Sequence, residues 1–404
     1  MDARSTRFTQ EAQRDGLSGM HSLIMAVAAG LSVANVYYAQ PLLDLMAKDL
    51  AISPAAIGLI VTLTQVGYGL GLIFIVPISD LVDRRSLIKV QGLLAAIALV
   101  VVATAGTKII LLLGMAVLGL LAVLVQILVA HAAALATAAQ RGRIVGMVTS
   151  GVVTGILAAR LVAGVVADFG GWRAVYMASA LSMVVMVGVL NSVLPRRSAG
   201  PRSGTYVNAL ISIPRTFLRE PVLLLRGVLA LLIFASFSTF WTALVLPLSA
   251  SPFSYSHTRI GLFGLVGLAG AIAATYAGRR ADRGHGNWTM GVSLVLLLAS
   301  WGLIALLPSS IPLMLAGVLL LDLGVQAVHV ANLSVVVALH PQRSGQLIGG
   351  YMMFYSVGSA IGAIAGTSAY GLFGWPGVCL MGGAFSFCAL ALWVATRLPA
   401  AADR

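Results

Sequence analysis

Charged residues are scarce in this chain. Only 9% of its 404 residues are charged and 59% are hydrophobic, whereas a soluble domain carries about 25% charged residues. So few charges cannot cover a surface that faces water, and most of the surface must therefore face lipid. The apolar runs are long and continuous, as at residues 109–139, unlike the alternating pattern of a membrane β-barrel. With about 20 apolar residues in each crossing, a chain of this length fits about twelve membrane helices.

Residues for enzymatic, metal or nucleotide chemistry are also missing. The two cysteines, Cys379 and Cys388, are nine positions apart and lie on opposite helix faces, which makes a disulfide between them implausible. The six histidines are scattered without metal-ligand spacing. Gly67, Gly69 and Gly71 lie within an apolar helix, with no strand before them and no lysine after them, so they are not a nucleotide loop and ATP-driven pumping is excluded. No nucleophile and base are paired, so we predict a protein that is not an enzyme and has no cofactor.

The net charge of +13 is distributed as in a membrane protein. A nucleic-acid partner would require a basic stripe or patch, but here Lys and Arg form short clusters between apolar segments. With the N-terminus inside, 20 of the 25 Lys and Arg residues fall in cytoplasmic segments and four in outer loops, and Arg160 lies inside a helix. The positive-inside rule therefore predicts a multi-pass protein of the bacterial inner membrane with both termini in the cytoplasm. The expected partner of such a surface is the lipid bilayer, and not a nucleic acid.

The apolar segments divide the chain into two sets of six helices. The first segment has no convincing cleavage site and is interpreted as a retained helix, and Ser53-Pro54 is predicted to cap and begin the second helix. A hydrophilic stretch separates the two sets, and its second part, Tyr206 to Arg219, is interpreted as an amphipathic helix on the inner membrane face. The predicted helices are 19–43, 54–79, 86–105, 109–138, 144–168, 174–194, 222–248, 259–278, 288–307, 311–338, 345–371 and 376–396. The predicted organisation is a cytoplasmic tail (1–18), an N-terminal bundle (19–194), a cytoplasmic linker (195–221), a C-terminal bundle (222–396) and a second tail (397–404).

The two sets of helices repeat each other. Asp80 and Asp282 follow the second helix of each half at an offset of 202 residues, and Gly171-Trp172 and Gly374-Trp375 end the fifth helix of each half at an offset of 203. Several matches at nearly one offset, each at the same place in its half, indicate a parallel internal repeat. Parallel six-helix repeats are one of the plans of secondary transporters, with the substrate site between the halves at mid-depth.

The loops after the second and eighth helices carry a family resemblance. In Pro77-Ile78-Ser79-Asp80-Leu81-Val82-Asp83-Arg84-Arg85 and in Gly278-Arg279-Arg280-Ala281-Asp282-Arg283-Gly284, the chain resembles the signature loop of the major facilitator superfamily. Leu81 and Asp83 depart from the family pattern, and the second loop is the cleaner copy. The resemblance implies an all-α membrane protein with twelve transmembrane helices in two six-helix bundles, which works as a monomer. It also implies that these loops latch the halves in an outward-open state, a role that would fall on Asp80, Arg84, Arg85, Asp282 and Arg283.

Further stretches resemble one branch of that superfamily. Gly151 and Gly155 match the glycine pair of the helix-five motif of proton antiporters, although Ile156, Ala159 and Arg160 replace its proline and last two glycines. Residues 35–43 and 324–332 look like bacterial drug- or sugar-efflux permeases. This resemblance implies proton-coupled export of a small organic molecule.

Asp322 is the carboxylate that lies deepest in a predicted helix. It is eleven residues from Ile311, which places it about 16 Å down the helix and near mid-membrane. An ionised carboxylate there is costly unless it is paired or wetted, so Asp322 is predicted either to carry a proton or to form a switchable ion pair. Gln326 and His329 follow on the same helix face, with Asn332 about 80° to the side. The alternative is a polar cluster that holds helices together.

Arg160 is the deep cation of the sequence. It is predicted to take part in gating, either by pairing with Asp322 across the halves or, alternatively, by bonding carbonyls or extending to the interface. The predicted proton-coupling residues are Asp322, His329 and Arg160. The predicted substrate-cavity residues are Asn35, Tyr38, Gln126, Phe237, Trp241, Asp322, Gln326 and Asn332.

Three functions are compatible with these residues. The first is a proton-coupled exporter, in which protonation of Asp322 biases one conformation. The second is an uptake symporter or facilitator on the same fold, because sequence does not fix the direction of transport. The third is a sensor or assembly factor without transport activity, which would normally need a partner-binding domain or long tail, and neither is visible in this sequence.

Overall fold

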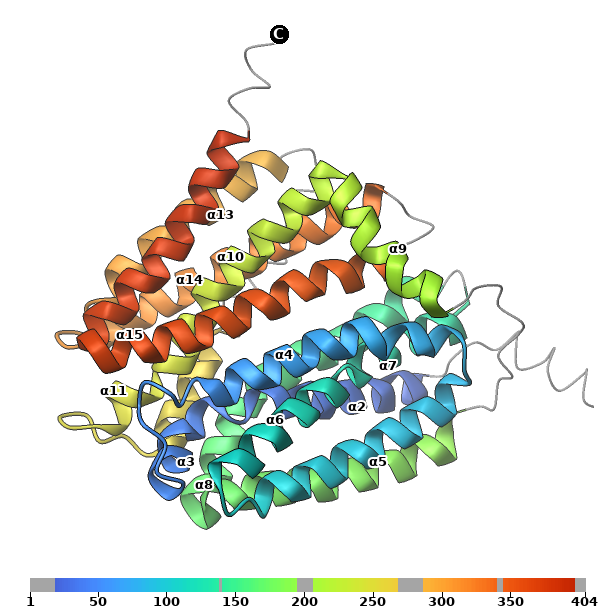
Figure 1. The fold of residues 1–404 in the computed structure, drawn as a ribbon, viewed down its shortest axis with the longest axis horizontal. Coiled ribbons are helices and arrows are strands. Elements are labelled where there is room, and N and C mark those ends of the chain that lie inside the picture. Colours follow the sequence, from blue (N-terminus) through green and yellow to red (C-terminus); the bar gives the residue numbers. More distant parts are fainter. Residues whose placement is uncertain (1–18, 138–139, 195–205, 268–285, 340–343, 397–404) are drawn as a thin grey trace, which may run out of the picture.

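The computed structural model describes residues 19–137, 140–194, 206–267, 286–339 and 344–396, and every regular element in these ranges is a helix. Figure 1 shows two bundles of long helices that lie against each other. The helices from α2 to α8 form one bundle, and those from α10 to α15 form the other. At the boundary between the bundles, α4 and α15 run side by side.

The first bundle contains the N-terminal part of the chain. Proline interrupts its first two spans because the ring removes a backbone donor and clashes with the preceding turn: Pro41 falls between α2 and α3, and Pro77 falls in the 3-10 turn after α4. The elements are α2 (Gly19–Tyr37), η1 (Gln40–Leu42), α3 (Leu43–Asp49), α4 (Leu59–Phe74), η2 (Val76–Asp80), α5 (Arg84–Ala103), α6 (Lys108–Ala122), α7 (Leu124–Leu135) and α8 (Arg141–Val193).

The second bundle contains the C-terminal part. A separate helix, α9 (Tyr206–Arg219), precedes it and has the bounds predicted for the amphipathic segment. The other elements are α10 (Pro221–Ala243), α11 (Val245–Ser249), a helix at 257–267, α13 (Gly286–Ile304), α14 (Ile311–Leu339) and α15 (Ser344–Ala395).

Two glycines with positive φ divide the longest helices. Gly171 in α8 has φ 71° and Gly374 in α15 has φ 64°, a region that glycine enters without the steric penalty of a Cβ. The tryptophan after each glycine is buried and anchors the turn: Trp172 donates to Asp49 Oδ2 (3.1 Å) and Trp375 donates to the carbonyl of Ile304 (3.0 Å). With α8 and α15 counted as two helices each, the described ranges contain helix at each of the twelve predicted crossings, although the crossing predicted at 259–278 is described only as far as residue 267. The repeat seen in the sequence is therefore also a repeat of structure.

One predicted helix start is wrong. Ser53-Pro54 does not begin the second span, because residues 54–58 form turns and α4 starts at Leu59. The backbone N–H of Ala56 donates to the carbonyl of Ser53 (2.9 Å), so the proline begins a tight turn and not the first turn of the helix.

Glycines bring helix backbones into contact at the same place in each bundle. In the first, a Cβ on Gly155 of α8 would lie 2.3 Å from the carbonyl oxygen of Gly30 in α2. In the second, a Cβ on Gly362 of α15 would lie 2.1 Å from the carbonyl oxygen of Ala235 in α10. Membrane helices associate through such close packing of small residues, since lipid provides no hydrophobic drive for it. The glycine pair of the sequence motif thus joins the first and fifth helices of its half.

Replacing Gly155 by alanine should destabilise the folded protein. The added methyl group would force two backbones apart, and overpacking of this kind costs about 1–3 kcal/mol. Gly188→Ala is the matched control, because nothing lies within 4 Å of a Cβ at Gly188. We expect a lower thermal unfolding midpoint in detergent for Gly155→Ala and an unchanged or higher one for Gly188→Ala. Equal midpoints would show that this helix contact is not tight.

Candidate functional site between the two bundles

Arg160 is buried where the two bundles meet. Its side chain projects from α8 and is 2% exposed, so it does not extend to the membrane interface. Its Nε donates to Oε1 of Gln40 (3.0 Å), which belongs to the 3-10 turn that follows α2. The break at Pro41 therefore places an amide oxygen beside the guanidinium.

Aromatic rings from both bundles surround the guanidinium. Its carbon atom lies 4.0 Å from the ring centroid of Trp241, 5.3 Å from that of Tyr37 and 5.9 Å from that of Phe237. Trp241 and Phe237 belong to α10 in the second bundle, whereas Tyr37 belongs to α2 in the first. A cation over an aromatic face in a desolvated site gains about 2 kcal/mol, so these rings offset part of the cost of burying Arg160.

Asp322 contacts the edge of the indole ring of Trp241, at its N–H group. It belongs to α14 and is 3% exposed, and its Oδ1 accepts a hydrogen bond from Nε1 of Trp241 (3.2 Å). No Arg160 nitrogen lies within 4.0 Å of a carboxylate oxygen of Asp322. The two charges therefore do not form the direct ion pair that the sequence left open, and the indole of Trp241 contacts both. We call Arg160, Trp241 and Asp322 the charged centre.

A glycine face packs against the charged centre. On the helix at 257–267, a Cβ at Gly261 would lie 2.5 Å from the carbonyl oxygen of Arg160, and one at Gly267 would lie 2.4 Å from Oδ2 of Asp322. Gly264 lies between them, at 3.3 Å from Arg160 Cβ by the same measure. These glycines let one helix of the second bundle approach both charges.

A cluster of tyrosines adjoins the charged centre at the boundary of the bundles. The hydroxyls of Tyr37 in α2 and Tyr355 in α15 are 2.5 Å apart, which makes a direct hydrogen bond between the bundles. The Tyr68 ring is 6.3 Å from the Tyr355 ring, and the Tyr68 hydroxyl accepts a hydrogen bond from Nε2 of Gln126 (3.1 Å). Gln126, a predicted cavity residue, is thus part of this cluster.

Other predicted cavity residues lie elsewhere. Asn35 accepts a hydrogen bond from Ser179 (2.6 Å) inside the first bundle, and Asn332 accepts one from Arg226 (3.3 Å) inside the second. Tyr38 is buried and Gln326 is half-buried. Asn35 and Asn332 therefore hold helices of one bundle together and are not bonded to Arg160, Trp241 or Asp322.

His329 is also separate from the charged centre. Its Nδ1 lies 3.1 Å from the hydroxyl of Tyr351, and its ring lies edge-on to Phe234 at 5.2 Å. Seven residues of α14 separate it from Asp322, which is about 10 Å along the helix axis. The two share a helix face, as predicted, but they do not share a hydrogen bond.

The predicted latch is described for the first loop only. Nε of Arg84 donates to the carbonyl of Ser79 (3.1 Å) and its Nη1 donates to that of Ala130 in α7 (3.2 Å), while Nη2 of Arg85 donates to the carbonyl of Asn191 in α8. These bonds stay within the first bundle. Asp80 ends η2, and Asp282 and Arg283 lie outside the described residues.

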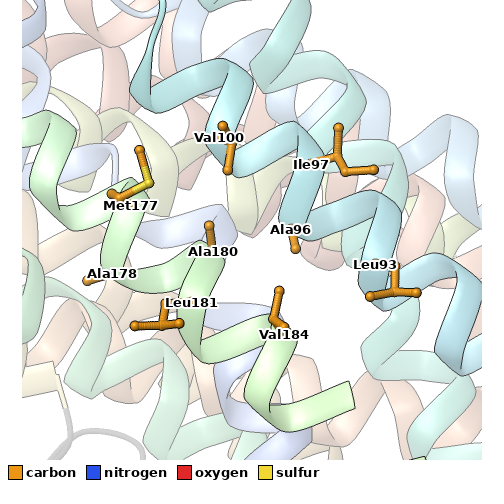
Figure 2. A pocket seen from close by; sticks show the side chains of 9 residues that line it. All are labelled: Leu93, Ala96, Ile97, Val100, Met177, Ala178, Ala180, Leu181 and Val184. Atoms are coloured by element: carbon orange, nitrogen blue, oxygen red, sulfur yellow. The ribbon is translucent and has the colours of Figure 1, made fainter. Parts of the chain in front are cut away.

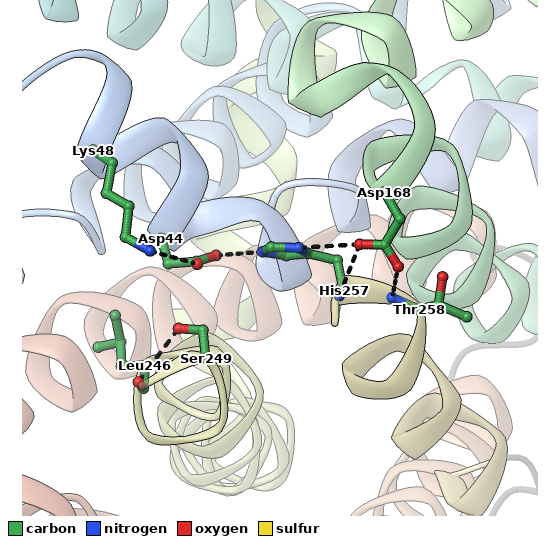
Figure 3. A network of polar contacts seen from close by, with 7 residues as sticks. All are labelled: Asp44, Lys48, Asp168, Leu246, Ser249, His257 and Thr258. Carbon is green, nitrogen blue, oxygen red and sulfur yellow. Dashed lines mark hydrogen bonds and ion pairs between the residues drawn. The ribbon is translucent and has the colours of Figure 1, made fainter. Parts of the chain in front are cut away.

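A second ionic network joins the bundles at the end that the charge distribution predicts to be the outer one (Figure 3). Nε2 of His257 lies 2.9 Å from Oδ1 of Asp44 in α3, and its Nδ1 lies 3.3 Å from Oδ1 of Asp168 in α8. The backbone N–H groups of His257 and Thr258 also donate to the two oxygens of Asp168, at 3.0 and 2.9 Å. We call His257, Asp44 and Asp168 the outer bridge. It fastens the first turn of the helix at 257–267 to two elements of the first bundle.

Apolar grooves lie on the described part of the surface. The groove in Figure 2, about 710 Å³, lies between α5 and the second part of α8 and is lined by aliphatic side chains such as Leu93, Ile97 and Leu181. Another, about 370 Å³, follows the boundary of α4 and α15 past Gln65 and Ser356. The first has no polar lining side chain to orient a solute, so neither its chemistry nor its place suits it to the substrate site between the bundles.

Sequence reasoning missed Tyr37, Gln40, Tyr355 and the outer bridge. Tyr37 and Gln40 belong to the stretch that carried the efflux-permease resemblance, and Pro41 was the available sign that its helix breaks there. Asp44, Asp168 and His257 fall at predicted helix ends. Charges at such places are normally solvated, so no pattern in the sequence distinguished them.

The outer bridge should respond to pH. The hydrogen bond with Asp44 raises the pKa of His257 above its usual value, against the lowering effect of partial burial, and the charge of Asp168 adds to the rise. Two positive groups are nearby: Lys48, whose Nζ lies 3.7 Å from Asp44, and Arg259, which is in the same helix as His257. Because the pKa is raised in the bridged state, the stabilisation is present at acid pH and is lost as pH rises through the raised value.

This response can be measured by thiol labelling in sealed vesicles. Thr367 in α15 is fully buried, and its hydroxyl donates to the carbonyl of Ala55 in the first bundle. A cysteine at this position therefore becomes accessible when the bundles separate. The substitution Thr367→Cys is made in a protein in which Cys379 and Cys388 are replaced by alanine. The labelling rate with an impermeant reagent is divided by the rate for the same protein carrying His257→Gln. We expect this ratio to rise about fivefold between acid and alkaline pH, because a partly exposed ion pair contributes about 1 kcal/mol. A constant ratio of the two rates would show that the bridge does not sense pH.

Comparisons with known proteins agree with this architecture. The family description "Major Facilitator Superfamily" matches residues 25–248 and 227–404. The transporter YgaY of Escherichia coli O157:H7 is 42% identical over 374 residues, covering 92% of this chain and 94% of YgaY. The transporter SCO4007 of Streptomyces coelicolor is 31% identical over 380 residues, covering 93% and 86%. A solved bacterial homolog of the human lysosomal transporter Spinster, inward-facing and occupied, has the same fold at 15% identity, with a TM-score of 0.75 over 93% of this chain and 96% of that one.

The match extends over both bundles, and it agrees with the two sets of six helices, the repeated Gly-Trp turns and the charges buried between the halves. The chain therefore belongs to the Major Facilitator Superfamily and is a multi-pass membrane transporter.

Proposed function

We propose that this transporter exports a small organic molecule across the bacterial inner membrane in exchange for protons. The observation that carries the proposal is the state of Asp322, a carboxylate that is 3% exposed and accepts one hydrogen bond, from Trp241. Its Oδ2 has no hydrogen-bond partner among the described residues. An ionised group in that position is costly, so binding a proton is a natural way to relieve the cost when no other cation is there.

The position of Asp322 suits a group that controls conformation. It contributes from the second bundle to an interface whose other charge, Arg160, comes from the first. Protonation of Asp322 removes the negative charge near Arg160 and changes the balance of forces between the bundles. Alternating access requires such a difference, because a ligand or proton shifts a conformational equilibrium only through unequal binding to the two states.

The structure corresponds, in this proposal, to a state closed at the predicted outer end. The outer bridge and the contacts of Ala55 with Thr367 and Ser368 join the bundles there. In an export cycle, substrate would load from the cytoplasm and the outer contacts would then separate to release it. Protonation of Asp322 would allow the bundles to return to the first state. The loops with Arg84 and Arg85 would latch the opposite state, as the family resemblance implies. An uptake symporter or facilitator uses the same parts in a different order, so direction is decided by the experiment below.

Asp322→Asn should abolish proton-coupled transport and leave the protein folded. Asparagine keeps an oxygen that can accept the hydrogen bond of Trp241, but it cannot exchange a proton. The purified protein would be reconstituted in liposomes with an internal pH dye and tested with cationic drugs, sugars and organic anions. We expect substrate-dependent proton flux in the wild type and none in Asp322→Asn. Asp49→Asn is the matched control: it makes the same chemical change at an exposed ion pair with Arg173, which includes no residue of the charged centre, and should retain flux.

The sign of the flux decides direction. Protons that move against the substrate support exchange, and protons that move with it establish a symporter. Substrate movement without proton flux, equal in the wild type and in Asp322→Asn, would contradict proton coupling at this residue.

A further inference from the structure

The charged centre contains two opposite charges that are each incompletely bonded. Nε of Arg160 donates to Gln40, and Oδ1 of Asp322 accepts from Trp241. Nη2 of Arg160 and Oδ2 of Asp322 are both buried, and neither has a hydrogen-bond partner within the described ranges. A buried charged group left with an unmade hydrogen bond carries a large desolvation cost, so each of these atoms is a point at which a ligand would gain binding energy.

Arg160 and Asp322 contact the same indole but do not pair with each other. The guanidinium carbon of Arg160 lies 4.0 Å from the centroid of the Trp241 ring, and the indole N–H is bonded to Asp322. If the charges paired directly, they would satisfy each other and little would remain for a ligand. Because they do not pair, the unbonded Nη2 of Arg160 and the unbonded Oδ2 of Asp322 can bind separate groups of one molecule.

The surroundings define the rest of such a molecule. Tyr37 and Phe237 add aromatic faces beside Arg160. No further charged side chain is bonded to Arg160 or Asp322 in the part of the chain that the structure describes. These rings favour an apolar or aromatic body on a molecule that carries its own charges.

Charge balance selects among the substrate classes. An organic anion would satisfy Arg160 but leave Asp322 with a free oxygen, and a cation would do the reverse. A neutral solute would satisfy neither charge fully. An amphoteric molecule, with one acidic group and one protonated amine, satisfies both at once and leaves the site without net charge.

We propose that this transporter binds a small amphoteric molecule with an apolar or aromatic body, its acidic group on Arg160 and its ammonium group on Asp322. This inference rests on the proposed function and extends it to the class of substrate. It also accounts for exchange. The ammonium group and a proton compete for the carboxylate of Asp322. Substrate therefore leaves Asp322 when a proton binds, and the proton leaves when substrate binds.

Binding to the full-length protein in detergent tests the substrate class without depending on transport. The probes are phenylalanine, tryptophan and naphthylalanine, each with two matched derivatives: the N-acetyl acid, which is only anionic, and the amide, which is only cationic. Binding is followed by the shift in thermal unfolding midpoint and by titration. We expect the amphoteric parents to bind about 10- to 100-fold more tightly than either derivative, because each loses one charged hydrogen bond.

Variants assign the two ends. Arg160→Gln should reduce affinity for the parent to that for the cationic amide, and Asp322→Asn should reduce it to that for the N-acetyl acid. Arg160→Lys keeps the charge and should restore part of the affinity, which a purely structural role for Arg160 does not predict. Asp49→Asn should bind the parents like the wild type. If no amphoteric parent binds, or if a singly charged derivative binds as tightly as its parent, the inference is overturned.

The outcomes separate this inference from the proposed function. An amphoteric probe that binds at Arg160 and Asp322 but drives no proton flux in liposomes refutes proton exchange and leaves the substrate class standing. Proton exchange driven equally by singly charged compounds supports the proposed function and refutes the amphoteric substrate.

Discussion

The cost of placing charge in a lipid environment governs this structure. The hydrocarbon region offers no water to a charged or polar group, so such a group must be bonded inside the protein, and a charge at the centre of a membrane helix costs about 2.5–3.5 kcal/mol even by the smaller estimates. The chain satisfies this constraint by placing most of its charged residues in the segments between the helices and by burying Arg160 and Asp322 where the bundles meet. Arg160 and Asp322 are stable there because aromatic rings, an amide and an indole N–H replace water around them.

The two kinds of contact in the molecule have different strengths for the same reason. Within a bundle, glycines such as Gly155 and Gly362 bring backbones together over extended lengths, and such packing resists change. Between the bundles, close glycine packing is joined by hydrogen bonds and ion pairs at the outer bridge, the tyrosine pair and the α4–α15 boundary. Polar contacts of this type can be exchanged for water or ligand. The bundles are therefore suited to move as units, with the change confined to the interface between them.

Much of the fold could be predicted from the sequence, and less of the site. Helix number, the repeat and the Gly-Trp turns follow from apolar length and from local chemistry, both of which are written into short stretches of chain. The position of Asp322 and Arg160 within helices was predictable for the same reason. That Trp241 contacts both was not, because it depends on how α10 packs against α8 and α14. Asn35 and Asn332 were predicted as cavity residues from polarity alone, yet each is bonded within its own bundle; polarity does not tell which neighbour a helix face meets.

The helix at 257–267 connects the outer bridge with the charged centre. His257 at its first turn forms the outer bridge with Asp168, and Gly261, Gly264 and Gly267 further along contact Arg160 and Asp322. Arg160 and Asp168 in turn lie on one helix, α8. A displacement of this helix that separates His257 from Asp168 would also shift its glycines against Arg160 and Asp322. Opening of the outer bridge and rearrangement of the charged centre are therefore mechanically coupled through one helix.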